Sequence, residues 1–347
     1  MSNAAANHHA MIQSNAAITA IGSYVPERRM TNSDLEKLVD TNDEWIVRRT
    51  GIHERRIAAE HEYTSDLCIA AVQDMIDRYD VDPTDVDYII VATTTPNAIV
   101  PGVASLVQAR FGIVSCGAVD VQAACAGFAS SIQLANGLIL SGMCRKILVI
   151  GGETLSKVTD YTDRATCILF GDGAGAILME KDAEGKGGVT AMYSTTDGSL
   201  GHQVYLSGLA PSIGEHPIQQ NRRLVQNGQE VYKWAISQVS EGITNMLARY
   251  GLQPGDIDWF VPHSANMRIV DAICERTGIA KERTLTSMGD YGNTSAASIP
   301  LALDNAVREG RVKPGQFVLL YGFGGGLTQA GVLIRWSMQS DRYNLSS

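Results

Sequence analysis

Short apolar runs alternate along the chain with longer segments in which apolar residues recur every three or four positions. The short runs are bounded by turn residues and predict strands, which in the first half cover 17–26, 86–95, 116–124 and 145–153. The longer segments predict helices at 65–80, 103–112 and 125–142. This alternation is typical of parallel strands joined by helical crossovers. We therefore expect an α/β fold.

The second half of the chain repeats this plan. It predicts strands at 257–263, 316–323 and 329–336, and helices at 230–251, 266–278 and 293–310. In each half one helix starts among small residues, continues through a Ser-Ile pair (131–132 and 298–299) and leads to an apolar strand. Cys125 and Asn293 lie at the starts of these two helices, so a duplicated chain brings them to one central place. The predicted organisation is a flexible leader at 1–15, an N-terminal half at 16–185, a C-terminal half at 186–340 and a tail at 341–347.

Charge and cysteine content narrow the class of protein. The net charge of −9 argues against a general nucleic-acid binder, because phosphate binding needs a basic face. Apolar runs are too short for a membrane span, and residues 1–15 lack the basic start and apolar region of a signal peptide. The six cysteines have no metal-binding spacing, so we expect free thiols in a reducing cytoplasm and no metal site.

Cys125 is the first candidate for chemistry, because a predicted strand ends and a predicted helix begins beside it. The positive end of a helix favours a thiolate and lowers the pKa of a thiol. Ala123, Ala124, Ala126 and Gly127 are small enough for a sharp turn and a close substrate. The alternative is a buried structural cysteine, which is the commoner role of a single cysteine.

His263 and Asn293 are weaker candidates when each is taken alone. His263 follows an apolar strand, and ligands bind at the carboxyl ends of strands in open α/β sheets; a surface or capping histidine is the alternative. An asparagine at a helix start is usually a cap. Three glycines at 324–326 allow backbone N–H groups to approach a substrate oxygen, although a tight turn also explains them. The glycine-rich segment 171–176 leads into a strand, which argues against a dinucleotide site.

Several motifs together resemble the 3-oxoacyl-(acyl-carrier-protein) synthase III family of thiolase-like condensing enzymes. The resemblance runs from about Ala16 to about Trp336. It rests on DTNDEWIVRRTGIHERRIA, DVQAACAGFASS, FGDGAGA, WFVPHSANMRI, YGNTSAASIPLALDNAVREGRVKPGQ and GFGGG. It implies a thiolase-like fold in which two duplicated α/β halves form five layers, α-β-α-β-α. It also implies a decarboxylative condensation of an acyl-CoA primer with malonyl-acyl-carrier protein, which starts fatty acid biosynthesis.

The resemblance also implies roles for residues. Cys125 carries the acyl group, the backbone N–H groups of Cys125 and Gly325 form the oxyanion hole, and His263 and Asn293 stabilise the enolate formed by decarboxylation. The resemblance further implies CoA and pantetheine contacts at Trp45, Arg49, Arg164 and Asn266, carrier-protein docking at Lys233, Arg268 and Arg276, and an acyl pocket formed by Thr94, Val100, Leu155, Phe170, Tyr232 and Phe323. Val100 stands where some members have an aromatic residue that closes the pocket across a dimer interface, so we expect a primer longer than acetyl.

The expected partners are acyl carrier protein, acyl-CoA and a second copy of the chain in a homodimer. No cofactor is expected, because the CoA and phosphopantetheine thioesters are substrates. Three alternatives stay open at this point. One is a papain-type cysteine hydrolase, which uses Cys, His and Asn in the same chain order. Another is an acyltransferase or specialised-metabolite synthase of the same fold with a different acceptor. The third is an inactive partner subunit that only binds.

Overall fold

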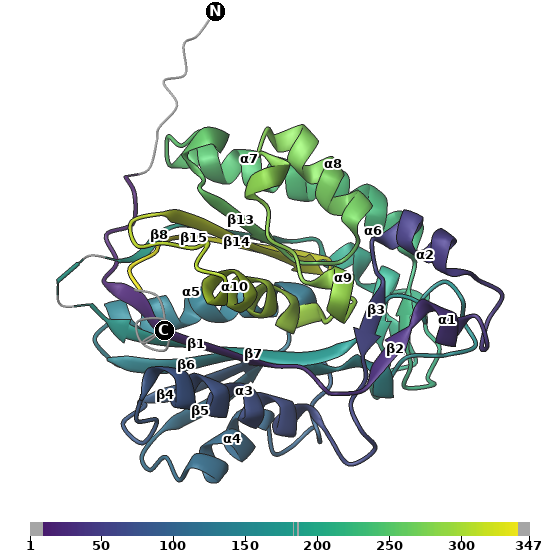
Figure 1. Cartoon of the computed structure of the whole chain (residues 1–347), viewed down its shortest axis with the longest axis horizontal. Helices are drawn as coiled ribbons and strands as arrows, with labels where there is room; N and C mark the ends of the chain where they lie inside the picture. Colours follow the sequence, from purple (N-terminus) through teal and green to yellow (C-terminus); the bar gives the residue numbers. More distant parts are fainter. Residues whose placement is uncertain (1–9, 183, 186, 339–347) are drawn as a thin grey trace, which may run out of the picture.

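Two β-sheets lie face to face with a pair of helices between them (Figure 1). The computed structural model describes residues 10–182, 184–185 and 187–338. In the first sheet the strand order is β1 (Ala16–Tyr24), β7 (Asp172–Lys181), β6 (Lys146–Thr154), β4 (Tyr88–Ala92) and β5 (Gly117–Val121). The three strands β6, β4 and β5 are parallel, whereas β7 runs antiparallel to both of its neighbours.

The second sheet repeats a smaller version of this plan. Its order is β13 (Trp259–Pro262), β14 (Phe317–Gly324), β15 (Thr328–Arg335) and β8 (Gly188–Thr196). Strands β13 and β14 are parallel and the other neighbours are antiparallel. The carboxyl ends of β13 and β14 therefore lie at one edge, which is where an α/β sheet places functional side chains.

The middle layer consists of α5 (Gly127–Leu140) and α10 (Ser298–Arg308) (Figure 1). Buried residues of both helices join both sheets in one core cluster. The outer layers are α3 (Thr64–Tyr79) and α4 (Val103–Phe111) on the first sheet, and α7 (Ser240–Arg249) and α8 (Met267–Thr277) on the second. These layers confirm the predicted five-layer thiolase-like arrangement. The middle helices are apolar on most of their surface because sheets cover them on both sides.

Smaller elements surround one end of the sheets. They are β2 (Arg29–Thr31), α1 (Asn32–Leu35), α2 (Asp43–Thr50), β3 (Glu54–Arg56), β9 (Val204–Leu206), β10 (Ser212–Ile213), β11 (His216–Pro217), β12 (Leu224–Gln226), α6 (Gly228–Trp234) and α9 (Met288–Tyr291). Short 3₁₀ turns occupy Ala124–Ala126, Leu155–Lys157, Gly198–Gln203, Pro254–Asp256, Lys281–Arg283 and Ser295–Ala297.

Two regions differ from the sequence-based expectation. The helix predicted at 230–251 runs without a break from Gly228 to Arg249, but a π-helical segment at Ala235–Val239 lies between its α-helical parts α6 and α7. The segment 188–226, for which the apolar pattern indicated no strand, contains β8 and the two small hairpin-like pairs β9–β12 and β10–β11. The strands of these pairs have only two or three residues each, so no period-two pattern can develop.

Part of the predicted leader contacts the folded chain. The Ile12 amide donates to the Thr190 carbonyl at 2.8 Å, and Ser14 contacts Asn136 of α5 through its hydroxyl. Residues 1–9, residues 183 and 186 of the predicted boundary region, and the predicted tail at 341–347 lie outside the described residues. Among the helices of the described part, none combines the length and the apolar character that a membrane crossing requires.

Candidate active site

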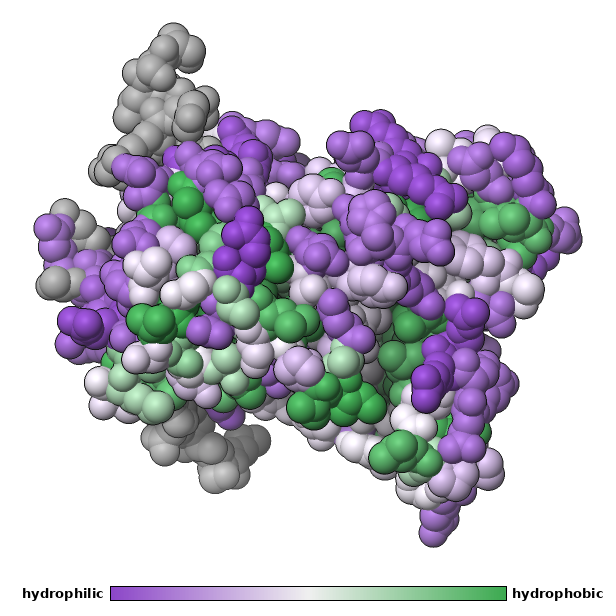
Figure 2. Space-filling view, turned by 90° about the horizontal axis from the view of Figure 1, so that it is seen from below, coloured by the Kyte–Doolittle hydropathy of each residue, from purple (hydrophilic) through white to green (hydrophobic). Residues whose placement is uncertain are grey.

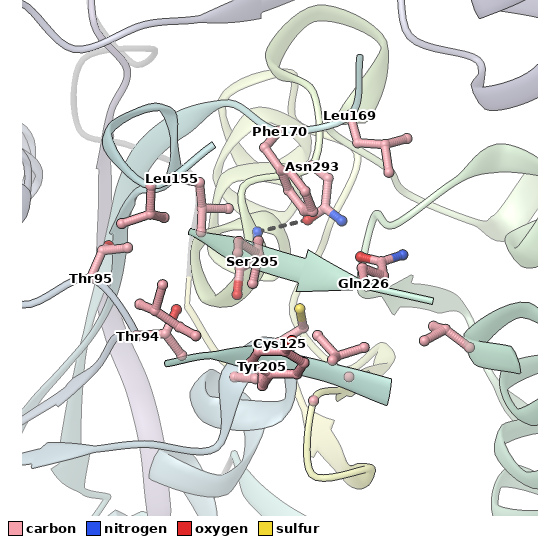
Figure 3. A pocket seen from close by; sticks show the side chains of 18 of the residues that line it. Thr94, Thr95, Cys125, Leu155, Leu169, Phe170, Tyr205, Gln226, Asn293 and Ser295 are labelled. Carbon is pink, nitrogen blue, oxygen red and sulfur yellow. Dashed lines mark hydrogen bonds between the residues drawn. The ribbon is translucent and has the colours of Figure 1, made fainter. Parts of the chain in front are cut away.

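One cavity of about 1770 Å³ brings together residues that are far apart in the sequence. Cys125 from the start of α5, His263 from the end of β13 and Asn293 from the segment before α10 all line it. Figure 3 shows the Cys125 sulfur directed toward the side of the cavity that holds Asn293. The cavity is larger than the roughly 300–1,000 Å³ usual for a small-molecule site, so it has room for an extended ligand.

The two helix starts at the cavity are equivalent in the duplicated fold. The turn Ala124–Ala126 leads into α5 at Gly127, and the turn Ser295–Ala297 leads into α10 at Ser298. Each turn opens with a non-glycine residue in the left-handed region, Ala124 with φ 44° and Ser295 with φ 48°. The expected register, which aligned the two Ser-Ile pairs, is therefore wrong by one helical turn: the structure aligns position 127, not 131, with position 298.

The nucleophile candidate lies against the glycine-rich end of β14. A Cβ atom added at Gly324 would lie 2.9 Å from the Cys125 sulfur, and one at Gly322 would lie 2.7 Å from the Cys125 carbonyl oxygen. Real Cβ atoms do not approach other atoms this closely, so a side chain at either position would force the neighbouring segments apart. Gly325 lines the cavity beside them. The glycines of β14, from the C-terminal half, therefore allow this strand to pack directly against the turn before α5, from the N-terminal half, which holds the Cys125 sulfur.

The state of the Cys125 thiol differs from the expectation. The helix start is where it was predicted, but the pKa of Cys125 is raised to about 12, chiefly by desolvation in the pocket and to a smaller extent by the nearby Glu153 carboxylate. The Ser295 side chain opposes this shift. The predicted lowering of the Cys125 pKa is therefore wrong, because burial disfavours the thiolate more than the helix start favours it. The thiol needs a proton acceptor before it can attack.

Asn293 is held in one orientation by the backbone of the next turn. The Ser295 amide donates to the Asn293 side-chain oxygen at 2.9 Å (Figure 3). The backbone amide of Asn293 donates to the Leu169 carbonyl at 2.8 Å. Because the side-chain oxygen is occupied, the NH₂ group is the end of this amide that a ligand in the cavity meets.

His263 is buried and neutral. Burial lowers the pKa of His263 to about 3, so the imidazole carries no charge at neutral pH. Its Nδ1 atom lies 2.8 Å from the Ser298 hydroxyl, and its ring meets Phe323 edge to face at 5.3 Å between centroids. These contacts fix the ring and leave Nε2 as the nitrogen available to a ligand.

Three further polar residues shape the site and were not singled out in the sequence. Ser298 holds His263, Ser295 holds Asn293, and Glu153 lies buried near Cys125. One feature of the sequence could have indicated Glu153, because it is a charged residue near the end of the mainly apolar strand β6. No such feature indicated the serines, because serine at a helix start is usually only a cap.

The predicted CoA contacts all line the cavity. Trp45 and Arg49 lie one turn apart on α2, and the Arg164 guanidinium lies 5.2 Å from the centroid of the Trp45 ring. Arg164 also pairs with Asp40 at 3.4 Å. An adenine between Trp45 and Arg164 thus requires the Arg164 side chain to move off the ring. Asn266 caps α8 through its side-chain oxygen.

Most of the predicted acyl-pocket residues line the same cavity: Thr94, Leu155, Phe170, Tyr232 and Phe323. Val100 does not line it; its side chain is 83% exposed on the loop before α4, and its neighbour Ile99 is a lining residue instead. The role expected of Val100, at the pocket of a second copy across a dimer interface, therefore stays a prediction.

The predicted docking residues are spread over two helices. Arg268 lines the cavity, whereas Lys233 lies outside its lining and is paired with Glu230 at 2.7 Å. Arg276 lies in the last turn of α8, two turns from Arg268. Of the three, only Arg268 is a rim residue of the cavity.

Comparison with known proteins gives a consistent result. Residues 119–198 match the model of the 3-oxoacyl-[acyl-carrier-protein] synthase III family, and residues 247–336 match the model of its C-terminal part. Proteins called beta-ketoacyl-[acyl-carrier-protein] synthase III 2 are similar throughout. The one from Halalkalibacterium halodurans is 56% identical, covering 95% of this chain and 99% of the relative; the one from Bacillus subtilis is 55% identical, covering 94% and 100%. A crystal structure of beta-ketoacyl-[acyl-carrier-protein] synthase III from Thermus thermophilus superposes with a TM-score of 0.89 at 46% identity, over 92% of this chain and 99% of that one.

Proposed function

This chain belongs to the 3-oxoacyl-[acyl-carrier-protein] synthase III family, and we propose that it condenses an acyl-CoA primer with malonyl-acyl-carrier protein to start fatty acid synthesis. The observation that carries the proposal is the meeting of Cys125, His263 and Asn293 in one cavity. The thiolase-like fold excludes the papain-type hydrolase.

In the first half-reaction, the Cys125 sulfur attacks the thioester carbon of acyl-CoA. The C–S bond to CoA breaks, the acyl group stays on Cys125, and CoA leaves as the thiol. The backbone N–H groups of Cys125 and Gly325 stabilise the oxyanion of the tetrahedral intermediate. Support comes from the absence of side chains at Gly322 and Gly324, which lets the glycine-rich end of β14 approach the nucleophile.

In the second half-reaction, malonyl thioester loses carbon dioxide and its carbanion attacks the acyl-Cys125 carbonyl. Negative charge develops on the malonyl thioester oxygen, so neutral hydrogen-bond donors stabilise the transition state more than the ground state. The Asn293 NH₂ group is oriented for this task by Ser295. The Ser298 hydroxyl, which donates to the Ser295 carbonyl at 2.8 Å, also lies 2.8 Å from His263 Nδ1. His263 donates from Nε2 in the tautomer in which this hydroxyl turns to donate to Nδ1 instead.

The test separates the two half-reactions. Intact-protein mass spectrometry after incubation with acyl-CoA should show one acyl adduct on the wild type and none on Cys125→Ala. Release of carbon dioxide from malonyl-acyl-carrier protein should fall in His263→Ala and Asn293→Ala, which still acquire the adduct. An acyltransferase with another acceptor would form the adduct without decarboxylating malonyl, and an inactive subunit would form no adduct; either result refutes the proposal.

The cavity supports a primer longer than acetyl. Its volume of about 1770 Å³ holds a pantetheine arm and leaves apolar wall around Leu155, Phe170 and Phe323. Acylation rates compared across acetyl-, butyryl-, hexanoyl- and octanoyl-CoA should rise beyond acetyl, because each added methylene buries apolar surface worth about 0.8 kcal/mol. Fastest acylation by acetyl-CoA would contradict this.

We propose that the acidic carrier protein docks at the cavity rim through Arg268, with Lys233 and Arg276 contributing less. Arg268 supports this because it alone of the three lines the cavity. Arg268→Glu should raise the KM for malonyl-acyl-carrier protein and leave that for malonyl-pantetheine unchanged, since the latter has no acidic protein surface. Arg311→Glu is the matched control, because Arg311 is exposed in a pair with Glu309. An equal effect on both substrates would refute docking at Arg268.

We propose that two copies pair through the edge strand β5 in a reducing cytoplasm. Exposed apolar side chains gather in the segments around this strand: Ile99, Val100, Val114 and Val119. Figure 2, which views the face that carries α4, shows apolar patches within the polar surface. An unpaired apolar edge is normally covered in a native protein. Val119→Lys should shift the mass measured by light scattering to one chain, whereas Leu38→Lys, at an exposed leucine after α1, should not. A wild type that is already a monomer would refute pairing.

A further inference from the structure

The backbone of Asn293 is held by one neighbouring segment, residues 168–171. The Asn293 amide donates to the Leu169 carbonyl at 2.8 Å, and the Asn293 carbonyl accepts the Gly171 amide at 3.1 Å. These two bonds pair Phe170 with Asn293 as in a parallel sheet, and Figure 3 shows the two residues side by side. The position of the segment 168–171 therefore sets the position of the Asn293 amide in the cavity.

A buried arginine, Arg55 of β3, holds this segment at its first residue. Its Nη2 atom donates to the Ile168 carbonyl at 2.5 Å, and its Nη1 atom donates to the Asn32 side-chain oxygen at 2.7 Å. Arg55 also packs against the pairing itself. A Cβ added at Gly171 would lie 3.1 Å from the Arg55 Cβ, and one at Gly292 would lie 3.0 Å from it. Arg55 thus contacts both of the chain segments that pair beside Asn293.

The other end of this bridge is a fixed point. Asn32 is buried, and its NH₂ group donates to the Asp43 carboxylate at 2.8 Å and to the Ile52 carbonyl at 2.9 Å. Because both donors of the amide are directed to these groups, the Asn32 oxygen is directed to Arg55. The guanidinium therefore ties the segment beside Asn293 to the start of α2.

Arg55 is a buried cation. Its side chain is fully buried, and desolvation lowers the pKa of Arg55 only to about 10, so it is charged at neutral pH. Within the described residues its acceptors are oxygens of uncharged groups, and its Nε atom has no hydrogen-bond partner. Burying a cation without a carboxylate partner costs folding free energy. Stability alone is therefore a poor explanation of this side chain.

We propose that Arg55 is a positioning residue that fixes Asn293 for decarboxylation of the malonyl thioester. Its planar guanidinium presents donors in a fixed geometry, so the segment 168–171 shifts only by breaking a charge-assisted hydrogen bond. Arg55 lies outside the lining of the cavity, so it acts on the substrate through Asn293. The inference rests on the proposed function, because it concerns the second half-reaction.

The competing explanation is that Arg55 only supports the fold. A structural role would slow both half-reactions together, and its effect would add to that of any other variant. A positioning role lowers kcat for carbon dioxide release, because the Asn293 hydrogen bond strengthens in the transition state. Its effect disappears in Asn293→Ala, which already lacks the group that is positioned.

Two single variants separate these explanations. Arg55→Lys keeps the charge but replaces the planar fork by a point charge that does not hold two acceptors in the same geometry. Arg78→Lys is the matched control for loss of a buried arginine. Arg78 donates to the Ile21 carbonyl at 3.2 Å and pairs with Asp304 at 2.6 Å, and neither of these partners lines the cavity.

The experiment measures carbon dioxide release from malonyl-acyl-carrier protein, acyl-Cys125 formation, and unfolding by denaturant. In Arg55→Lys we expect kcat for carbon dioxide release to fall about tenfold, with KM and the acylation rate changed less than about threefold. In Arg78→Lys stability should fall, and both rates of the folded protein should stay within about twofold of the wild type. The double variant Arg55→Lys/Asn293→Ala should release carbon dioxide as fast as Asn293→Ala, within about twofold.

Three results overturn the proposal. The first is carbon dioxide release that falls no further in Arg55→Lys than in Arg78→Lys. The second is an equal fall of acylation and carbon dioxide release in Arg55→Lys. The third is a double variant about tenfold slower than Asn293→Ala, since additive effects show independent action.

Should Arg55→Lys not fold, Asn32→Ala tests the same link, because it removes the acceptor that aligns the guanidinium at 2.7 Å. Asn32→Ala should slow carbon dioxide release in the wild-type background and have no effect in Asn293→Ala. No loss in the first background, or an equal loss in both, overturns the proposal. A wild type that releases no carbon dioxide refutes the proposed function instead.

Discussion

The substitution Gly324→Ala tests whether the position of the Cys125 sulfur limits acyl transfer. The new Cβ would lie 2.9 Å from both the sulfur and the Cβ of Cys125 and 3.3 Å from its backbone nitrogen. Unstrained contacts between such atoms need about 3.5–4.0 Å, so the segments that hold Gly324 and Cys125 must separate by roughly 0.6–1 Å. The φ angle of Gly324 lies outside the left-handed region, so the substitution acts through this contact alone.

A displacement of about 1 Å at a reacting atom costs on the order of 10²-fold in rate. We therefore expect acyl-Cys125 formation in Gly324→Ala to fall by about that factor, with a loss of about 1–3 kcal/mol in unfolding free energy from overpacking. Rapid-quench mass spectrometry with acyl-CoA measures the rate, and denaturant unfolding measures the stability.

The next residue supplies the matched control. A Cβ at Gly325 would have its nearest neighbours at 3.4–3.5 Å, which is ordinary contact, and alanine keeps the backbone N–H group. Gly325→Ala should therefore acylate much faster than Gly324→Ala. Equal rates for the two variants, or a Gly324→Ala variant as fast as the wild type, would show that the sulfur is free to move and would refute the reasoning.

Three other predictions concern charge and hydrogen bonding. Asp304 is buried and pairs with Arg78 at 2.6 Å and with Arg308 at 2.9 Å, so Asp304→Asn should lower the unfolding free energy by about 3 kcal/mol. Glu309→Gln, which removes a charge from an exposed pair, should lower it by less than ~0.5 kcal/mol, and equal losses in the two variants would contradict this prediction. The folded-state pKa of His263, about 3, lies below its unfolded value near 6.5, so the unfolded chain binds the extra proton between these values. Stability relative to His263→Gln should then decline as pH falls below 6.5, by up to ~1.4 kcal/mol per pH unit, and a pH-independent difference would refute it. Ser298→Ala removes the partner of His263 Nδ1 and should slow carbon dioxide release about tenfold with acylation retained; an unchanged rate would show that the ring needs no partner.

Local sequence patterns predicted the catalytic residues at positions where a reactive residue type lies at the end of a strand or the start of a helix. Cys125, His263 and Asn293 each lie where a strand ends or a helix begins, and the duplicated pattern by itself brings two of them together. Apolar runs predicted four strands of the first sheet and three of the second, the glycine-rich segment 171–176 indicated the strand that follows it, and β8 was not predicted. The period of apolar residues predicted the helices of all three helical layers. These signals are local because backbone geometry sets the spacing of buried side chains.

Contacts between distant segments decided the rest. His263 and Ser298 are separated by 35 positions, and neither has a neighbour in the sequence that indicates the other. The pKa directions of Cys125 and His263 also came from the fold, because desolvation depends on which side chains surround a group and not on which ones precede it. The sequence thus determined which groups reach the cavity, while only the tertiary structure decided their protonation, their orientation and the further side chains that hold them.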